Sequence, residues 1–335
     1  MKLLIVTQKV DISDRNLGFF HRWLAAFAKY AEVIVIANEV GVYELPKNVK
    51  VFSLGKEEGR SRLARLARYR ALLREHLPSA TGVFFHMCPE YVIAAYPLVK
   101  KFGKKSSFWY VHREVSWRLW LAEKLVDKVF TASKESFRLS SKKIEVVGHG
   151  VDAALFLPNA ERRPSLHLVT VGRISRVKDL RTPVLGFLAL KKKFPDARFS
   201  IIGEPITEAD RNYERELREE FGSSVSFCGG APHGAALSEY PYSAFIHASL
   251  TGAVDKAVLE ALAIGCAVFT SSEAFSESTP GIFRFEQGNA ANLAETLTRA
   301  FKAGKLGYNK EARAYVMEHH NLDTLVSKIL SFYED

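Results

Sequence analysis

The sequence predicts an α/β protein built from two doubly wound, Rossmann-like domains. Short apolar runs alternate with longer amphipathic stretches along the whole chain. The length of 335 residues exceeds what one hydrophobic core usually supports. Residues 158–164, PNAERRP, are polar, contain two prolines and show no periodicity, which is typical of a domain boundary. We therefore expect an N-terminal domain at residues 1–160, a C-terminal domain at 161–320 and a final helix at 321–335.

The first domain is expected to contain a parallel sheet. Each candidate strand is a short apolar run, and helical patterns separate most of the runs, as the crossovers between parallel strands require. The candidate strands are residues 3–7, 32–37, 49–53, 82–86, 106–111, 128–131 and 144–147.

The second domain repeats this rhythm. Its candidate strands are residues 166–171, 198–202, 225–228, 244–247, 267–270 and 282–285. The ligand sites of open α/β sheets lie at the carboxyl ends of the strands, so we expect a cleft where the two domains face each other. The final segment has Leu325, Ile329 and Phe332 at helical spacing, and we expect this helix to pack across the junction.

The net charge of +10 is unevenly placed along the chain. Residues 1–160 contain 26 Lys and Arg against 15 Asp and Glu, whereas residues 161–335 contain 21 against 22. This asymmetry predicts an anionic partner for the first half, such as a phospholipid surface, a pyrophosphate-linked lipid or nucleic acid. A generally basic proteome explains it equally well.

Residues 60–74 form a basic pattern with leucines at helical spacing. One interpretation is a helix that lies on an anionic membrane surface, and the other is a solvated helix with its apolar stripe in the core. The apolar run LLIV near Met1 is too short for a signal peptide or a membrane span. We therefore expect a cytoplasmic protein with, at most, peripheral contact at the cytoplasmic face of the membrane.

The segment from residue 169 to 269 carries the clearest chemical signal. In VTVGRISRVKDL, Arg173 and Lys178 follow a strand-like run, and in DKAVLEALAIGCAVF, Glu260 lies on an apparent helix ahead of Gly265. Two cations and one acid suit a nucleotide diphosphate, because cations bind phosphates and a carboxylate accepts hydrogen bonds from a ribose diol. The alternatives are solvated surface cations and an exposed helix acid.

The order of these residues resembles the retaining GT-B glycosyltransferases of family GT4, glycosyl transferases group 1. The resemblance rests on Gly172, Arg173 and Lys178, on Glu260 between Leu259 and Ala261, and on Gly265, with support from the segments VSFCGG, SAFIHAS and GHGVD. It implies transfer of a sugar from a nucleotide diphosphate sugar to an acceptor hydroxyl with retained anomeric configuration. The implied role is the synthesis of cell-envelope polysaccharides or glycolipids, with a glycan or lipid-linked acceptor.

The resemblance also implies roles for single residues. Arg173 and Lys178 would bind the donor diphosphate, and Glu260 would bind the ribose hydroxyls as the second Glu of an E-x7-E motif. The first Glu of that motif is replaced by Gly252. Asp255, Lys256 and backbone amides at the helix N-terminus are expected to substitute for it, although a plain helix N-cap is an equal explanation of Asp255.

Two residues of the first domain match family positions. Gly18 lies in the loop that the family places beside the donor phosphates, where its backbone N–H would serve as a donor. His112 follows strand 106–111, where family members carry a histidine near the reactive centre. A neutral imidazole there accepts a proton or binds the donor sugar. A simple loop turn and a structural histidine are the alternatives.

No Asp-x-Asp occurs in the sequence, so we expect no metal and no cofactor apart from the donor substrate. Positive charge for the leaving group would come from Arg173 and Lys178, which we assign to catalysis together with His112. A nucleotide-sugar epimerase, or a transferase-like protein with chemistry altered by Gly252, is the alternative enzyme. A nucleic-acid-binding α/β protein is a distant third, because the cations are dispersed and no nucleic-acid module is recognisable.

Overall fold

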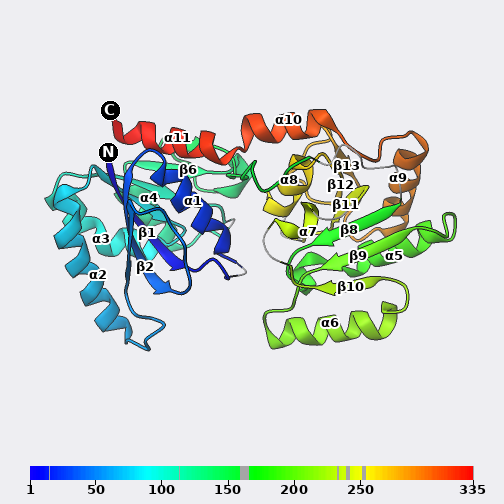
Figure 1. The fold of residues 1–335 in the computed structure, drawn as a ribbon, viewed down its shortest axis with the longest axis horizontal. Helices are drawn as coiled ribbons and strands as arrows, with labels where there is room; N and C mark the ends of the chain where they lie inside the picture. Colours follow the sequence, from blue (N-terminus) through cyan, green and yellow to red (C-terminus); the bar gives the residue numbers. More distant parts are fainter. Residues whose placement is uncertain are drawn as a thin grey trace. The chain divides into compact units, whose positions relative to one another are not determined.

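Parallel strand pairing builds two separate sheets, which confirms the predicted doubly wound α/β fold. The computed structural model describes residues 1–14, 16–112, 114–158, 166–231, 234–238, 242–250 and 254–334. By its contacts the chain divides into two units. Unit 1 comprises Met1–Gly150 and His320–Asp335, and unit 2 comprises Val151–His319 (Figure 1).

The sheet of unit 1 has the strand order β3-β2-β1-β4-β5-β6-β7. Its strands are β1 Lys2–Val10, β2 Glu32–Val40, β3 Val49–Ser53, β4 Gly82–His86, β5 Lys105–Trp109, β6 Lys128–Thr131 and β7 Ile144–Val146. Each predicted strand of this half corresponds to one of them. β1 and β2 continue beyond the predicted ends through the pairs Lys9 with Glu39 and Val10 with Val40, where polar side chains interrupt the apolar pattern.

Alternate residues of these strands point to opposite faces of the sheet and pack in two separate hydrophobic cores. Leu3 and Ile5 pack with α1 Gly18–Ala28 and α11 Leu322–Glu334. Leu4 and Val6 pack on the other face with the helices α2 Arg62–His76, α3 Pro89–Lys101 and α4 Trp117–Leu125. Short 3-10 turns lie at η1 Leu77–Ser79 and η2 Lys134–Ser136.

The predicted C-terminal helix is present as α11 and belongs to unit 1, where it lies beside α1 (Figure 1). Leu325 and Ile329 are fully buried in the core that α1 shares. At the end of the helix, the Tyr333 hydroxyl donates to the Val83 carbonyl at 2.8 Å and lies 2.5 Å from the Ser107 hydroxyl. The chain thus returns from unit 2 to complete unit 1.

The sheet of unit 2 has the order β10-β9-β8-β11-β12-β13, and its strands agree with the predicted ones. They are β8 His167–Val171, β9 Arg198–Ile202, β10 Ser226–Gly229, β11 Ala244–His247, β12 Ala267–Thr270 and β13 Ile282–Arg284. One face packs against α5 Arg181–Lys191, α6 Glu208–Phe221 and α9 Ala290–Lys302, and the other against α8 Lys256–Ala263 and α10 Lys310–His319. The short helix α7 spans Ala235–Ser238.

The division between the units falls at Gly150, ahead of the predicted boundary at residues 158–164. The physical reason is that Val151 and Phe156 are fully buried in the α8 core of unit 2. The boundary was predicted from polar, proline-containing residues, and these do not reveal that the preceding residues of the connection are buried. Residues 159–165 lie outside the described part of the chain.

The strand order of each sheet reverses direction at one point, between β1 and β4 in unit 1 and between β8 and β11 in unit 2. The connections that leave these neighbouring strands diverge to opposite faces, which opens a crevice at their carboxyl ends. These two switch points are where ligand chemistry is expected. Among the described helices, none is long and apolar enough to cross a membrane.

We predict that α11 stabilises unit 1 through its apolar face. Ile329→Ala should lower the free energy of unfolding of unit 1 by about 2–5 kcal/mol, because a fully buried side chain leaves a cavity. Lys328→Ala, on the exposed face of the same helix, should change it little. All four tryptophans lie in unit 1, so tryptophan fluorescence during urea unfolding reports this unit. Equal effects of the two substitutions would contradict the assignment.

Candidate functional site

The turn after β8 presents two cationic residues at the switch point of unit 2. Gly172 has φ +147°, and a side chain on Gly203 would place its Cβ 1.8 Å from the Gly172 carbonyl oxygen. This close backbone approach therefore requires glycine at Gly203. Arg173 follows directly, with 41% of its side chain exposed and its Nε 3.9 Å from the Asp210 carboxylate.

Lys178 ends the 3-10 turn η3 Arg176–Lys178 and forms an ion pair across the switch point. Its Nζ contacts the carboxylate of Asp255, which precedes α8 on the far side of β11. The Leu250 N–H donates to the Val177 carbonyl at 2.9 Å, so the two loops are also joined through their backbones. The loops after β8 and β11 are therefore held together where a ligand would bind.

Asp255 has three partners. One carboxylate oxygen, Oδ1, accepts from the Ala257 N–H at 3.1 Å and caps α8. The other oxygen, Oδ2, takes Lys178 and lies 3.2 Å from Nε2 of His247. Asp255 is thus both the helix cap that one interpretation of the sequence predicted and a polar residue at the site.

His247 is buried at the end of β11, with 5% of its surface exposed. A carboxylate only accepts, so Nε2 carries the hydrogen that is donated to Asp255. Nδ1 of a neutral ring is then an acceptor, and it lies 2.9 Å from the Thr270 hydroxyl at the end of β12. That hydroxyl oxygen in turn accepts from the Ser272 N–H at 3.1 Å. The chain of donors fixes both the tautomer and the ring orientation.

The electrostatics of this cluster keep Asp255 ionised. Burial would raise the pKa of Asp255, but the charge of Lys178 and the hydrogen bond from His247 outweigh burial and hold that pKa well below its usual value. The Lys178 side chain is 29% exposed and that of Asp255 is 20% exposed. Lys178 is thus a positioned cation rather than a mobile surface lysine.

Glu260 lies farther along α8, about 7 Å from Asp255 along the helix axis. It is buried, with 7% of its surface exposed, so the alternative of an exposed helix acid does not hold. Lys256 is the first residue of α8 and is half-buried. Gly252 lies outside the described residues. Arg173, Lys178, Asp255, Lys256 and Glu260 therefore all belong to unit 2, and Lys178 and Asp255 are in direct contact.

Comparison with known proteins identifies the domain that carries these residues. Residues 165–303 match the family model of glycosyl transferases group 1. Most of unit 2 is therefore similar to the domain that this family model describes. This match confirms the family resemblance that Arg173, Lys178 and Glu260 indicated. A comparison with curated protein sequences gives no match.

Solved structures of glycosyltransferases resemble the whole chain. Anabaena HepE in complex with UDP has a TM-score of 0.79 at 14% identity, with all of both chains covered. Sucrose-phosphate synthase from Thermosynechococcus elongatus has a TM-score of 0.78 at 14% identity, covering 99% of this chain and 98% of that one. A glycosyltransferase from Rickettsia africae has a TM-score of 0.76 at 15% identity, with the same coverage. These likenesses confirm the GT-B class of fold.

The two predicted site residues of unit 1, Gly18 and His112, lie in different places. Gly18 is the first residue of α1, where a side chain would bring its Cβ 2.9 Å from the Ile12 carbonyl oxygen. Its N–H donates to the Asp14 carbonyl at 2.9 Å and is therefore used within the loop. His112 is exposed beyond the carboxyl end of β5, and its Nδ1 accepts from the Glu114 N–H at 3.2 Å.

His247 is the residue that sequence reasoning missed. It occurs within SAFIHAS, a segment that supported only the resemblance. A polar residue that ends a buried apolar strand was the available signal, because such a side chain needs a partner at the carboxyl edge. The partners, Asp255 and Thr270, come from two other segments of the chain and cannot be found from local pattern.

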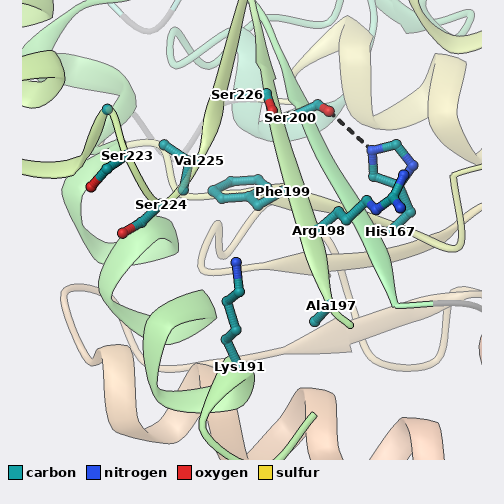
Figure 2. Close-up of a pocket in the computed structure, with 11 residues that line it drawn as sticks. His167, Lys191, Ala197, Arg198, Phe199, Ser200, Ser223, Ser224, Val225 and Ser226 are labelled. Carbon is teal, nitrogen blue, oxygen red and sulfur yellow. Dashed lines mark hydrogen bonds between the residues drawn. The ribbon is translucent and has the colours of Figure 1, made fainter. Parts of the chain in front are cut away.

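A cavity of unit 2 lies at the opposite edge of the sheet from Lys178 and Asp255. It has a volume of about 420 Å³ and is lined by residues near the amino ends of β8 and β9, including His167 and Arg198 (Figure 2). Figure 2 shows the hydrogen bond of 3.0 Å between His167 and the Ser200 hydroxyl. Because the carboxyl ends carry Lys178 and Asp255, this cavity is separate from the candidate site.

We predict that the Asp255 carboxylate makes the stability of unit 2 depend on pH. Its pKa is lower in the folded state, so its stabilisation is present above the unfolded value of about 3.9 and is lost as pH falls below it. Asp255→Asn should destabilise unit 2 by about 1–3 kcal/mol at neutral pH and by less below pH ~4. Hydrogen exchange of β11 and α8 amides measures this difference. A difference that stays constant into acid would contradict the account.

Proposed function

We propose that this glycosyltransferase moves a sugar from a nucleotide diphosphate sugar to an acceptor hydroxyl, with retained anomeric configuration and without a metal. The observation that carries the proposal is the positioned Lys178 ammonium at the switch point of a group 1 glycosyltransferase domain. The Anabaena structures contain UDP, UDP with glucose, and UDP-glucose, which favours a uridine diphosphate sugar as the donor.

In this proposal, Arg173 and Lys178 bind the diphosphate. The ammonium of Lys178 has three N–H donors, of which one serves Asp255, so the others remain to bind phosphate oxygens. Negative charge develops on the departing diphosphate, and a cation already fixed in place stabilises it without reorganisation. Arg173 is exposed and its contact with Asp210 is long, so its guanidinium can turn toward the same phosphates.

Glu260 binds the ribose. A carboxylate accepts hydrogen bonds from both vicinal hydroxyls, and burial strengthens these bonds relative to water. The N-terminus of α8, capped by Asp255, adds the positive end of a helix dipole near the phosphates. His112 at the carboxyl end of β5 is proposed to contact the donor sugar or the reacting hydroxyl, since its ring is exposed.

Retention follows, in this proposal, from attack on the face that the diphosphate leaves. A leaving oxygen of the diphosphate takes the proton of the acceptor hydroxyl while the new glycosidic bond forms and the old bond to phosphate oxygen breaks. Arg173 and Lys178 offset the charge in place of a metal, so no metal site is required. The chemistry needs no cofactor beyond the donor itself.

The acceptor is proposed to be a glycan or a lipid-linked molecule of the cell envelope. In α2, Leu72 and Leu73 are buried in unit 1, whereas Leu63 is 80% exposed and Leu66 is 37% exposed. The second half of the helix thus lies in the core, and its first half presents leucine and arginine to solvent. This favours peripheral contact of unit 1 with an anionic membrane at its cytoplasmic face.

Epimerisation of the nucleotide sugar is the second candidate. It is favoured by one observation, the replacement of the first Glu of the motif by Gly252. Transfer releases free nucleoside diphosphate only when an acceptor is supplied, whereas epimerisation consumes no acceptor. Measuring this release with and without acceptor separates the two reactions.

We predict that Lys178→Gln weakens UDP binding by about 10- to 100-fold, the usual loss for one charged hydrogen bond. Lys193→Gln, an exposed lysine after α5, should leave UDP affinity unchanged. Calorimetric titration measures both, after hydrogen exchange has shown that unit 2 remains folded. Equal affinities of the two variants would remove Lys178 from the diphosphate site.

We also predict that turnover persists in the presence of EDTA, since fixed cations take the role of a metal. Once a donor and an acceptor have been found by screening, NMR of the product should show the anomeric configuration of the donor. Loss of activity that Mg²⁺ restores would contradict metal independence, and an inverted product would contradict retention.

A further inference from the structure

A cavity of about 500 Å³ lies in unit 1 at the carboxyl edge of the sheet. It is lined by Gln8 near the end of β1, Asn38 near the end of β2 and Cys88 two residues after β4, so it opens at the switch point between β1 and β4. Its other walls come mainly from the N-terminal halves of α2 and α3 and from the first turn of α4. The position is where a doubly wound sheet binds a ligand.

The cavity is positively charged. Arg62 and Arg65 of α2 and Arg118 of α4 line it, against the single carboxylate of Glu90. Glu90 is 3.6 Å from Arg118, and within the described ranges neither Arg62 nor Arg65 forms an ion pair with an acid. Arginines that face a cavity without carboxylates to neutralise them have the chemistry of an oxyanion site.

The Arg65 guanidinium is fixed at the cavity wall and has one buried N–H that can donate to a ligand. One terminal nitrogen of its guanidinium donates to the Asn38 side-chain oxygen, which fixes the group at the cavity wall. Its Nε is buried and lacks a hydrogen-bond partner among the described residues. A buried N–H of a charged group is costly to leave unpaired, so its retention here points to a ligand that accepts from it.

Helix orientation adds to the positive potential. Arg62 is the first residue of α2 and Arg65 is the fourth, and no acid occupies that first turn. Cations at a helix N-terminus are repelled by the helix dipole, whereas anions are attracted. The N-terminal turns of α3 and α4 contribute Glu90, Tyr91 and Arg118 to the same cavity. An anion there would meet three helix N-termini and three guanidinium groups together.

The remaining polar groups do not bring negative charge. Burial, with the nearby Glu90 carboxylate, raises the pKa of the Cys88 thiol to about 12. Burial likewise raises the pKa of Tyr91. Both groups are therefore neutral hydrogen-bonding partners at physiological pH. Among the residues that line the cavity, Glu90 alone offsets the charge of the three arginines.

We propose that this cavity binds a phosphate group of the acceptor. The proposal rests on the proposed function, in which a glycan or lipid-linked molecule is the acceptor, and adds that unit 1 binds this acceptor and that the acceptor is a phosphate ester. Leu66 lines the cavity and is 37% exposed. Two further exposed apolar residues are sequence neighbours of lining arginines: Leu63 follows Arg62, and Trp117 precedes Arg118. These side chains suit the chain of a phospholipid or lipid phosphate, although a soluble sugar phosphate offers the same head group.

The test compares cavity arginines with a matched arginine outside the cavity. Arg62→Gln, Arg65→Gln and Arg118→Gln are measured beside Arg70→Gln, which removes an exposed charge from the same helix. Calorimetry with glycerol 3-phosphate and with glycerol probes a soluble phosphate ester. Sedimentation with phosphatidylcholine vesicles, with and without phosphatidic acid, probes the lipid source. UDP affinity is measured on each protein as a control for unit 2.

We expect saturable binding of glycerol 3-phosphate or of the phosphatidic acid vesicles, without binding of glycerol or of pure phosphatidylcholine. Each cavity substitution should weaken it about tenfold, as loss of one charged hydrogen bond does, and Arg70→Gln should not. Binding of glycerol 3-phosphate would indicate that the acceptor is a soluble phosphate ester. Binding of the phosphatidic acid vesicles alone would indicate that it is a lipid phosphate.

Absence of binding to both probes, or equal weakening by Arg70→Gln, would overturn the proposal. If UDP still binds in that case, only the acceptor site fails. If UDP fails to bind the wild-type protein, the proposed donor function fails. The binding measurements with glycerol 3-phosphate and with phosphatidic acid vesicles still test the cavity in that case.

Discussion

The carboxylate of Asp255 is the group on which the candidate site depends. It caps α8, accepts from His247 at the end of β11 and pairs with Lys178 after β8. These partners lie on both sides of the switch point, so a single side chain fixes the distance between a cation and a helix N-terminus. Lys178 alone would be a flexible surface lysine, because its side chain has many rotamers and ammonium groups are strongly hydrated. The ion pair positions the Lys178 ammonium, which is proposed to bind phosphate.

Charge at the switch point of unit 1 is arranged in two ways. Lys9 is surrounded by carboxylates, with its Nζ 2.9 Å from Glu39 and 3.0 Å from Asp14, and hydrogen bonds to these two groups raise its pKa. It therefore holds the loop before α1 in place. Arg62 and Arg65, by contrast, line a cavity and form no ion pair with any described acidic residue. The first arrangement is structural, and the second leaves positive charge available to a ligand.

The fold was largely predictable because strands of a parallel sheet are buried on both faces and form continuous apolar runs. All of the predicted strands correspond to strands of the structure. The domain boundary was not predictable, because Phe156 is buried in the core of unit 2 and local composition does not reveal this burial. In the candidate site, the order of residues along the sequence indicated Lys178 and Glu260, and their roles stay predictions. The contact of His247 with Thr270 depends on the register between β11 and β12, which a linear pattern does not specify.

In the proposed function, unit 2 recognises a nucleoside diphosphate mainly through its phosphates. Calorimetric titration of the wild-type protein with UDP, UMP and uridine measures this, because the three ligands differ only in phosphate groups. The account predicts that affinity falls by about tenfold or more as each phosphate is removed. Equal affinities for UDP and uridine would contradict it.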